Sequence, residues 1–391
     1  MQMSSQSVTL ARQDFFTIVH ADSGSRARRG TLALKHGIVE TPVFMPVGTN
    51  GTVKALTNED LEEIGFSIIL ANTYHLYLRP GTEVIGKAGD LRSFTQWKKN
   101  YLTDSGGFQI FSLAPFRKIT EEGAAFRSHI DGSYHLLTPE KAVEIQTVLN
   151  SDIQMQLDVC TPWETPEKNA RSALEITGRW LKRAYESWRH SADNGYHGSL
   201  FSIVQGNFYP ELRRESVEKT LEYNTPGIAI GGLSVGEPEE VFREYLHFTS
   251  CLLPEEKPRY VMGIGTPEYI LWAIEEGIDM FDCVFPTRVG RNGLVLTHDG
   301  PVSLKKAENT ENFVPIDTSC SCKVCKTYSR AYMRHLFKTR EILCSMLASY
   351  HNLYFLNNLV LNARSAISRN KFMDFKKAFL NRYLYKGDKN E

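Results

Sequence analysis

One carboxylate of this chain stands where a strand is expected to bury apolar surface. In the stretch MFDCVFPTR, residues 280–288, Asp282 interrupts a short apolar run, and Arg288 and Arg291 follow it. A buried carboxylate without a partner costs several kcal/mol. Its position therefore predicts either a hydrogen-bonding partner or a role in a reaction, because a carboxylate can act as a nucleophile or exchange a proton.

Other candidate residues, three of them polar, two glycines and one methionine, stand at the ends of further apolar runs. They are Asp104, Asp158, Gln205, Gly231, Gly232 and Met262. Each also has a purely structural interpretation: the aspartates and the glutamine can cap turns, glycine supplies positive φ, and methionine fills cores. Their recurrence at successive run ends nevertheless predicts that they converge on one site.

Eight short apolar runs are expected to position these residues. They cover residues 43–49, 67–75, 101–107, 152–160, 200–206, 227–233, 259–265 and 280–286. Near-continuous apolar runs are typical of strands buried on both faces of a parallel sheet, and helical patterns lie between most of them. This alternation predicts an α/β fold, an irregular (β/α)8 TIM barrel whose active face is formed by the C-terminal strand ends.

The rest of the chain is expected to surround the barrel. Residues 1–13 are predicted to be loosely ordered, and residues 14–300 to form the barrel with an N-terminal hairpin cap, because residues 14–48 alternate around the turn SGSRARRG. Residues 301–391 are expected to hold an inserted zinc-binding subdomain and C-terminal helices that close the barrel.

Composition limits the classes of partner and location. The chain has 391 residues, of which 42% are apolar, and its 45 basic residues balance its 45 acidic ones. Bulk charge therefore does not indicate a nucleic-acid partner, although a local basic patch remains open. The polar N-terminus lacks a signal-peptide core, and no apolar run is long enough for a membrane span. A cytoplasmic protein without a membrane partner is predicted.

The motif CSCKVC predicts a metal site. It places Cys320, Cys322 and Cys325 within six residues, and a tetrahedral zinc is often held by such a group plus one distant residue. The candidates for the fourth ligand are His335, Cys344 and His351, and the pattern leaves the choice between them open. Four protein ligands would make the site structural, whereas an open position would allow catalysis.

The motifs together resemble one enzyme family. The segments LTDSGGFQIFSL, QLDVCTP, VQG, GGLSVGE, YVMGIGTPE, FDCVFPTRVGRNG, CSCKVC and YSRAYMRHL are similar in order and spacing to the queuine tRNA-ribosyltransferases, or tRNA-guanine transglycosylases. The resemblance covers about residues 14–365. It implies a barrel with a structural zinc ion, one per chain, usually in a homodimer, that exchanges the wobble guanine of tRNA for a 7-deazaguanine base.

The resemblance also implies roles for individual residues. Asp282 matches the nucleophile and Asp104 the general acid/base. The expected base-binding residues are Ser105, Gly106, Gly107, Phe108, Asp158, Gln205, Gly231, Gly232, Leu233 and Met262. The expected tRNA contacts are Gly263, Ile264, Gly265, Thr266, Pro267, Glu268, Tyr269, Thr287, Arg288, Val289, Gly290 and Arg291. The expected zinc ligands are Cys320, Cys322, Cys325 and His351.

Three positions bear on which base is inserted. Bacterial relatives usually carry Tyr where this chain has Phe108 and an acidic residue where it has Val159, while eukaryotic relatives carry Gly where it has Val235. Val235 favours 7-aminomethyl-7-deazaguanine, which we expect, and Phe108 favours the alternative, queuine.

Other classes of protein fit the motifs less well. A non-catalytic tRNA-binding homologue would not need Asp104 and Asp282. A zinc-dependent barrel hydrolase would need histidines at run ends, where His75 has no neighbouring histidine. An archaeal-type enzyme would need a further RNA-binding domain, for which the chain leaves no room.

Overall fold

The computed structural model of the protein describes residues 15–113 and 117–384. The predicted loosely ordered segment 1–13 and the end of the predicted C-terminal region, residues 385–391, lie outside the described residues. Among the described residues, no helix is long and apolar enough to cross a membrane.

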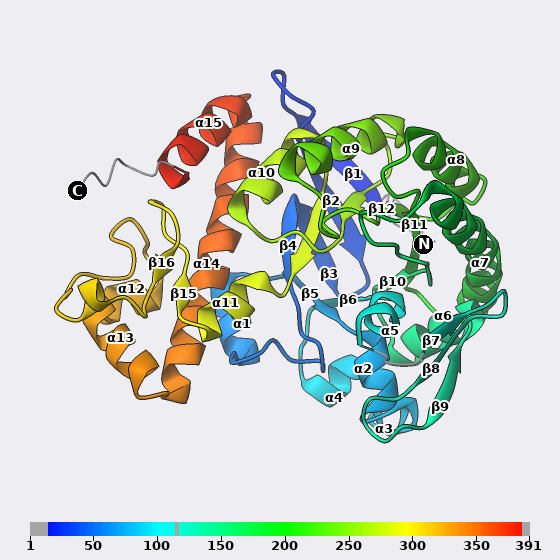
Figure 1. The fold of residues 1–391 in the computed structure, drawn as a ribbon, viewed down its shortest axis with the longest axis horizontal. Helices are drawn as coiled ribbons and strands as arrows, with labels where there is room; N and C mark the ends of the chain where they lie inside the picture. The colour runs from blue at the N-terminus through cyan, green and yellow to red at the C-terminus, as the bar shows by residue number, and fades with distance from the viewer. Residues whose placement is uncertain (1–14, 114–116, 385–391) are drawn as a thin grey trace, which may run out of the picture.

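The eight predicted strands form one parallel sheet. They are β4 (Val43–Pro46), β5 (Ile68–Ala71), β6 (Asn100–Thr103), β10 (Ile153–Met155), β11 (Ser199–Val204), β12 (Gly227–Ile230), β13 (Arg259–Val261) and β14 (Met280–Cys283). Their order is β4-β14-β13-β12-β11-β10-β6-β5. The two edge strands meet at a parallel bridge between Val47 and Leu70 and a 2.6 Å bond from the Gly48 amide to the Leu70 carbonyl. The predicted irregular barrel is confirmed (Figure 1).

Helices follow the strands and cover the outside of the barrel. They are α1 (Asn58–Ile64), α2 (Thr73–Leu78), α3 (Thr82–Lys87), α4 (Leu91–Thr95), α5 (Gly107–Leu113), α6 (Pro139–Leu149), α7 (Glu167–Asp193), α8 (Pro210–Leu221), α9 (Glu239–Leu252) and α10 (Pro267–Glu275). Thr138 caps α6 by accepting a 3.1 Å hydrogen bond from the Lys141 amide. The sequence Thr-Pro-Glu stands at the start of α6 and again at the starts of α7 and α10, but there without a side-chain cap.

The strand pleat decides which side chains enter the barrel. In β14, Met280 packs in the interior cluster and Phe281 in the outer layer against the helices. Side chains two residues apart on a strand share a face, so Asp282 points to the interior at the C-terminal end. The same two-residue spacing places four other candidate residues on the interior face, each two positions after an interior core residue. The pairs are Leu102 and Asp104, Ile203 and Gln205, Ala229 and Gly231, and Tyr260 and Met262.

A three-stranded antiparallel sheet closes the opposite end of the barrel. It consists of β1 (Phe16–Ala21), β2 (Arg28–Leu34) and β3 (Gly37–Thr41), so the predicted cap is a meander of three strands. Leu32 and Val39 pack into the interior cluster of the barrel. Arg28 forms a buried ion pair with Asp279, the residue before β14, which attaches the cap to the barrel.

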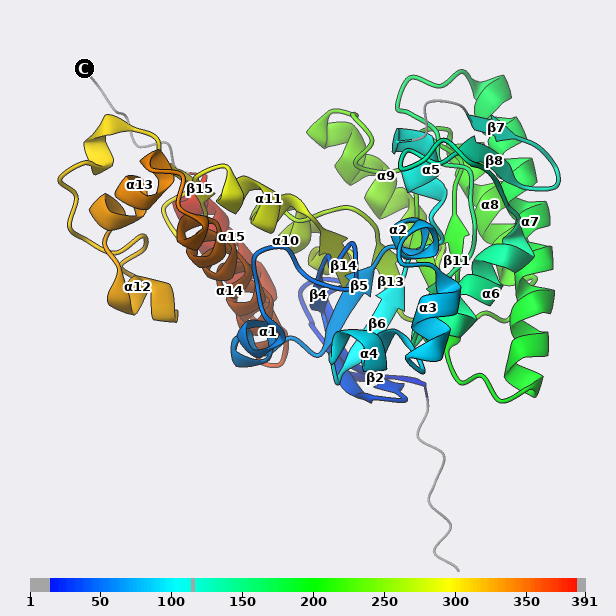
Figure 2. The ribbon, with the colours of Figure 1, turned by 90° about the horizontal axis from the view of Figure 1, so that it is seen from below.

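Two further segments interrupt the alternation of strands and helices. A second antiparallel sheet of β7 (Arg117–Ile119), β8 (Ala124–Arg127) and β9 (Tyr134–Leu137) lies between α5 and α6. The elements after β14 are α11 (Phe285–Arg291), β15 (Leu294–Val295), β16 (Val302–Ser303), the 3-10 helix η1 (Ala307–Asn309), α12 (Lys323–Thr327), α13 (Arg330–Lys338), α14 (Ile342–Ile367) and α15 (Phe372–Tyr383). The long helix α14 runs between the barrel and the small lobe that holds α12 and α13 (Figure 2).

Candidate active site and metal centre

Asp282 lies at the interior end of β14 and is partly buried. Its Oδ1 atom accepts a 2.6 Å hydrogen bond from the Tyr260 hydroxyl and a 2.9 Å bond from the Gly263 amide. Burial raises the pKa of the Asp282 carboxyl, and the two hydrogen bonds oppose that shift. Among the described residues no donor contacts Oδ2, so this oxygen keeps its lone pairs for another molecule.

Asp104 is a second buried carboxylate, in the loop after β6. The Asn72 side-chain amide donates to Oδ2, and the Thr73 amide donates to Oδ1 at 2.9 Å. Burial raises the pKa of this carboxyl to about 6, the hydrogen bonds oppose the rise, and the negative charge of Asp282 adds to it. A group that titrates near 6 can both release and accept a proton close to neutral pH.

Asp158, Gln205 and two glycines form a second polar cluster. The Gln205 side-chain amide donates a 2.6 Å hydrogen bond to Asp158 Oδ2. A Cβ atom on Gly231 would lie 2.6 Å from Gln205 Nε2, and one on Gly232 would lie 2.6 Å from Gln205 Oε1. Because neither distance tolerates a carbon atom, glycine is required for Gln205 to reach Asp158. Gly232 also has a φ of +65°, which favours glycine.

The burial of Asp158 leads to a prediction about how the free energy of unfolding depends on pH. Burial raises the pKa of its carboxyl to about 6 from 3.8, so the folded chain binds this proton more tightly than the unfolded chain. Stability is therefore lost as pH rises from about 4 to about 6, by up to about 3 kcal/mol. We expect Asp158→Asn to raise the free energy of unfolding at pH 7 and to have little effect below pH 4, as measured by urea denaturation. An equal gain at both pH values would contradict this account.

Arg213 on α8 holds the backbone of Gly231 and Gly232 by hydrogen bonds, and no pattern in the sequence pointed to it. It is fully buried and donates to the carbonyls of Gly231 at 2.8 Å and Gly232 at 3.2 Å, and to that of Asn207 at 2.7 Å. Burial lowers the pKa of the guanidinium to about 10, which leaves it charged at pH 7. The bonds fix the course of the chain from residue 231 to residue 232.

The other expected base-binding residues border these clusters. Ser105, Gly106 and Gly107 are buried, and a Cβ on Gly107 would lie 3.0 Å from the Asp158 carbonyl, which places the loop after β6 against Asp158. Leu233 is buried and Met262 is half-buried. Phe108 is 53% exposed, so its ring is free to cover a ligand. Tyr260 and Asn72, which hold the two carboxylates, were not predicted as site residues.

The expected tRNA contacts divide into exposed and packed positions. Gly263 and Arg288 are exposed, and Glu268, Val289 and Arg291 are half-buried. Ile264, Gly265, Pro267, Thr287 and Gly290 are buried. Tyr269 packs between Phe242 and Trp272, with ring centroids 4.5 and 5.1 Å away. Several of these positions therefore pack inside the protein, in the loop after β13 and in the helices α10 and α11, rather than lie on its surface.

The metal ligands expected from the resemblance lie together. The ligand atoms of Cys320, Cys322, Cys325 and His351 all lie within 4.8 Å of one another. The three sulfurs lie 3.9, 3.5 and 3.3 Å from His351 Nδ1, in that order. Ideal tetrahedral zinc bonds would place sulfur and nitrogen about 3.5 Å apart, so the four residues fit a metal ion. His351 Nε2 donates to the Leu296 carbonyl at 2.7 Å, which leaves Nδ1 as the metal-facing atom.

The two alternative fourth ligands lie elsewhere. His335 stacks on Tyr332 on the α13 surface, with centroids 6.4 Å apart. Cys344 is buried and its thiol donates to the Met333 carbonyl at 3.6 Å. The structure therefore resolves the choice that the sequence pattern left open in favour of His351.

The fold and the polar interior end of its strands define a (β/α)8-barrel enzyme, and an inserted lobe carries a Cys3His cluster that can hold a metal ion. A family model described as queuine tRNA-ribosyltransferase matches residues 22–385. Similar proteins include the queuine tRNA-ribosyltransferase of Treponema denticola, 57% identical over 372 residues, which cover 95% of this chain and 98% of that protein. That of Caldanaerobacter subterraneus subsp. tengcongensis is 51% identical over 368 residues, 94% of this chain and 97% of that protein.

The chain therefore belongs to the queuine tRNA-ribosyltransferase family, the tRNA-guanine transglycosylases.

Proposed function

We propose that this chain exchanges the wobble guanine of tRNA for 7-aminomethyl-7-deazaguanine through a covalent bond between Asp282 and the ribose. The observation that carries this proposal is the pair of carboxylates at one strand-end face, Asp282 with a free Oδ2 and Asp104 with a pKa near 6. The base must leave the anticodon stack to reach them, as in other enzymes that act on a base.

The first half of the reaction forms a glycosyl ester. Asp282 Oδ2 attacks C1′ of the ribose while the bond from C1′ to N9 breaks and its electron pair moves into guanine. Asp104 gives its proton to the departing base. The intermediate is an Asp282–ribosyl ester, as in retaining glycosidases. The Tyr260 hydroxyl and the Gly263 amide, both on Oδ1, hold the carboxylate in one orientation.

The second half of the reaction reverses these roles. The incoming base loses its N9 proton to the Asp104 carboxylate and attacks C1′ from the side that guanine left. The ester bond then breaks and returns the electron pair to Asp282. Two inversions at C1′ leave the configuration unchanged, so the product keeps the glycosidic geometry of the substrate.

The cluster of Asp158 and Gln205 supports recognition of the base. The Asp158 carboxylate can accept hydrogen bonds from the ring N–H and amino group of a guanine-like edge, and Gln205 can donate to the neighbouring carbonyl oxygen. Phe108 and Met262 would cover the faces of the ring, which contributes about 1–3 kcal/mol per stacked base.

The loop after β12 supports the aminomethyl base as the incoming one. The Glu237 carboxylate accepts hydrogen bonds from the amides of Ser234 and Val235, while the Leu233 carbonyl has no donor among the described residues. A carbonyl without a donor suits an ammonium group. Phe108, which lacks a phenolic hydroxyl, favours queuine as the alternative, but the Val235 side chain takes up room that the larger base needs.

Base exchange with purified protein tests the proposal. We would incubate tRNA carrying labelled wobble guanine with either 7-aminomethyl-7-deazaguanine or queuine. Release of label with the aminomethyl base alone is the expected result. Release with queuine would replace the proposed substrate by the alternative, and no release with either base would favour the non-catalytic tRNA-binding homologue.

A glycine substitution tests the geometry of base recognition. In Gly231→Ala the new methyl group would lie 2.6 Å from Gln205 Nε2 and 2.8 Å from Ile203 Cγ2, so Gln205 must move. We expect kcat/KM for base exchange to fall about 100-fold, the loss that a shift of about 1 Å in a site can cause. Gly178→Ala in α7 is the control, because its Cβ meets only Lys219 at 3.6 Å. Full activity of Gly231→Ala would show that the position of Gln205 does not matter for base binding.

The metal and the assembly are parts of the same proposal. The Cys3His set suits Zn²⁺, held in a structural role because all four positions are protein ligands. We also propose a homodimer, since the ring of Tyr328, just after α12, stacks on Tyr332 of α13, which stacks on His335, and Tyr332 is 38% exposed. Light scattering would test it. A tRNA substrate is consistent with the predicted cytoplasmic location.

A further inference from the structure

Cys251 is the one exposed cysteine of this chain. All seven cysteines lie within the described residues, and Cys251 stands in the last turn of α9. Arg26, in the connection between β1 and β2, donates a hydrogen bond to its sulfur. This contact places the thiol at the end of the barrel that the N-terminal cap closes, away from the carboxylate site, so the proposed reaction does not use it.

His247 joins the Cys251 thiol to a carboxylate. It precedes Cys251 by four residues on α9, so the two side chains share a face of the helix. The thiol donates to His247 Nε2 across 3.7 Å, and His247 Nδ1 donates to Glu276 Oε2 at 2.9 Å. Because the two bonds use different ring nitrogens, the carboxylate holds the imidazole in the tautomer whose Nε2 can take a proton from sulfur. This order of thiol, imidazole and carboxylate is that of a nucleophile with its base.

The Arg26 guanidinium completes the surroundings of the Cys251 sulfur. It also donates to the Ser250 carbonyl at 3.0 Å and lies 3.6 Å from the Glu276 carboxylate, and these contacts hold it beside the thiol. A positive charge and an imidazole next to a sulfur favour the thiolate, which is the reactive form of cysteine. The exposed thiol is therefore suited to attack a small molecule that arrives from solvent.

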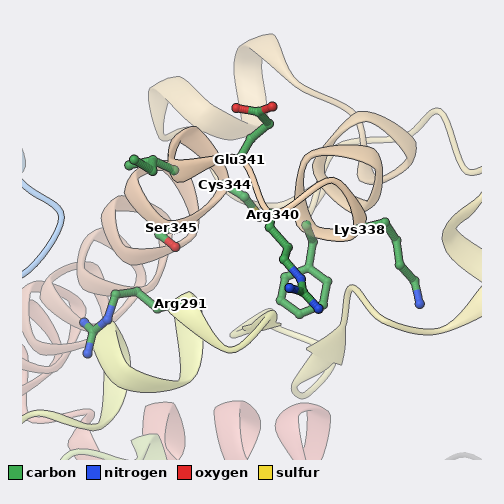
Figure 3. A pocket seen from close by; sticks show the side chains of 8 residues that line it. Arg291, Lys338, Arg340, Glu341, Cys344 and Ser345 are labelled. Carbon is green, nitrogen blue, oxygen red and sulfur yellow. The ribbon is translucent and has the colours of Figure 1, made fainter.

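The other cysteines outside the metal cluster lack this combination. Cys344 lines a pocket of about 480 Å³ together with three basic side chains (Figure 3). Its thiol is buried and donates to the Met333 carbonyl, and burial raises its pKa to about 11. Burial also raises the pKa of Cys160 to about 12 and that of Cys283 to about 11. Cations alone therefore do not make a thiol of this chain reactive, because exposure and a base are also needed.

A cleft borders the His247 and Glu276 side chains. It has a volume of about 170 Å³ and is lined by Arg243, Leu246, His247, Trp272, Glu275 and Glu276. Arg243, His247 and Cys251 are spaced by four residues, so they follow one another along one face of α9. With a rise of 1.5 Å per residue, Arg243 lies on the order of 12 Å from Cys251. A molecule the size of a short peptide can therefore occupy the cleft and reach the thiol.

The charges of the cleft favour an anionic molecule. Its two carboxylates have partners in the protein, since Glu275 forms an ion pair with Lys376 and Glu276 with Arg26. Among the described residues Arg243 forms no ion pair, and its guanidinium lies 4.9 Å from the centre of the Trp272 ring. The cleft therefore presents one available cation, on an aromatic face, to a carboxylate from outside.

We propose that Cys251 is a site of reversible modification by the disulfide of a small anionic thiol. The thiol proton moves to His247 Nε2, and the Cys251 sulfur attacks one sulfur of the disulfide. The disulfide bond breaks as the new sulfur–sulfur bond forms, and the leaving thiolate takes up the proton that His247 holds. No further oxidant is needed, because the electrons that Cys251 gives up reduce the incoming disulfide. A carboxylate of the attached half pairs with Arg243.

The test is the rate at which glutathione disulfide modifies the full-length protein, followed by mass spectrometry of the intact chain and of its peptides. We expect one adduct per chain, on Cys251, and no such adduct in Cys251→Ser. In His247→Gln and Arg26→Gln the rate should fall about tenfold or more, because the base or the charge beside the sulfur is lost. The matched control is His190→Gln on α7, an exposed histidine that contacts no cysteine among the described residues, and its rate should equal that of the wild type.

A second disulfide tests the anionic class of the ligand. Arg243→Gln should slow modification by glutathione disulfide about threefold and leave modification by the neutral bis(2-hydroxyethyl) disulfide unchanged. Equal slowing with both disulfides would overturn the anionic class. Unchanged rates in both His247→Gln and Arg26→Gln, or adducts that form at equal rates on several cysteines, would overturn the proposal as a whole. Base exchange should be unchanged in Cys251→Ser, so the two proposals can fail independently.

Discussion

Asp282→Asn is expected to abolish base exchange. The amide cannot form the glycosyl ester, because its oxygen is a weak nucleophile and no other carboxylate shares the Oδ2 position. The side chain of the variant has the shape of Asp282. Its amide nitrogen is expected to take the place of Oδ2, because the Tyr260 hydroxyl and the Gly263 amide both donate to the Oδ1 position. We expect kcat for label release to fall by at least about 10⁴-fold, the scale of effect when a nucleophile is removed.

Two measurements make this result specific to the nucleophile. The ribosyl ester of the wild-type protein should appear as a tRNA-linked species on a denaturing gel and be absent in Asp282→Asn. The affinity of the variant for tRNA should remain, since Arg288 and Arg291 on α11, which are expected to contact tRNA, are unchanged. Full exchange by the variant, or a covalent species that survives the substitution, would transfer the role of nucleophile to another residue.

Loss of the metal is expected to disrupt the lobe and the long helix together. Structural zinc supplies folding free energy directly, about 10–16 kcal/mol in small zinc-binding peptides. We expect Cys325→Ser to purify without zinc and its Tm to fall by about 10 °C or more. The wild-type protein should contain one zinc ion per chain by elemental analysis.

Cys344→Ser is the matched control for the metal prediction. It makes the same chemical change at another buried cysteine, on α14, whose sulfur lies 3.6 Å from the Met333 carbonyl and outside the ligand set. Its zinc content should equal that of the wild type. Active wild-type protein without any bound metal would show that the Cys3His cluster is held together by packing alone.

The sequence was informative wherever chemistry coincided with strand periodicity. Asp104, Gln205 and Asp282 could be placed at strand ends because the apolar runs and the two-residue pleat fix the face on which they emerge. The fold prediction was confirmed for the same reason, since each of the eight runs had to be buried on both sides. The N-terminal cap was also expected, although its third strand was not.

The parts that could not be predicted depend on long-range packing. Arg213 resembles any arginine of a helix, and only the fold brings α8 beneath the Gly231 carbonyl. Tyr260 resembles an ordinary core residue until β13 pairs with β14 and its hydroxyl meets Asp282. The inserted sheet β7–β9 did carry a local signal, the turn sequence DGS at residues 131–133, which is typical of a hairpin.

The helix α14 joins the Cys3His cluster to the strand that bears Asp282 through neighbouring residues. His351 holds the Leu296 carbonyl, and the next residue, Asn352, donates to the carbonyls of Pro286 at 2.9 Å and Leu294 at 3.0 Å. Pro286 opens α11, just after Asp282. The lobe is therefore not a detachable module: a chimera that exchanges it with a foreign lobe must carry α14 along, or the strand that bears Asp282 loses its anchor.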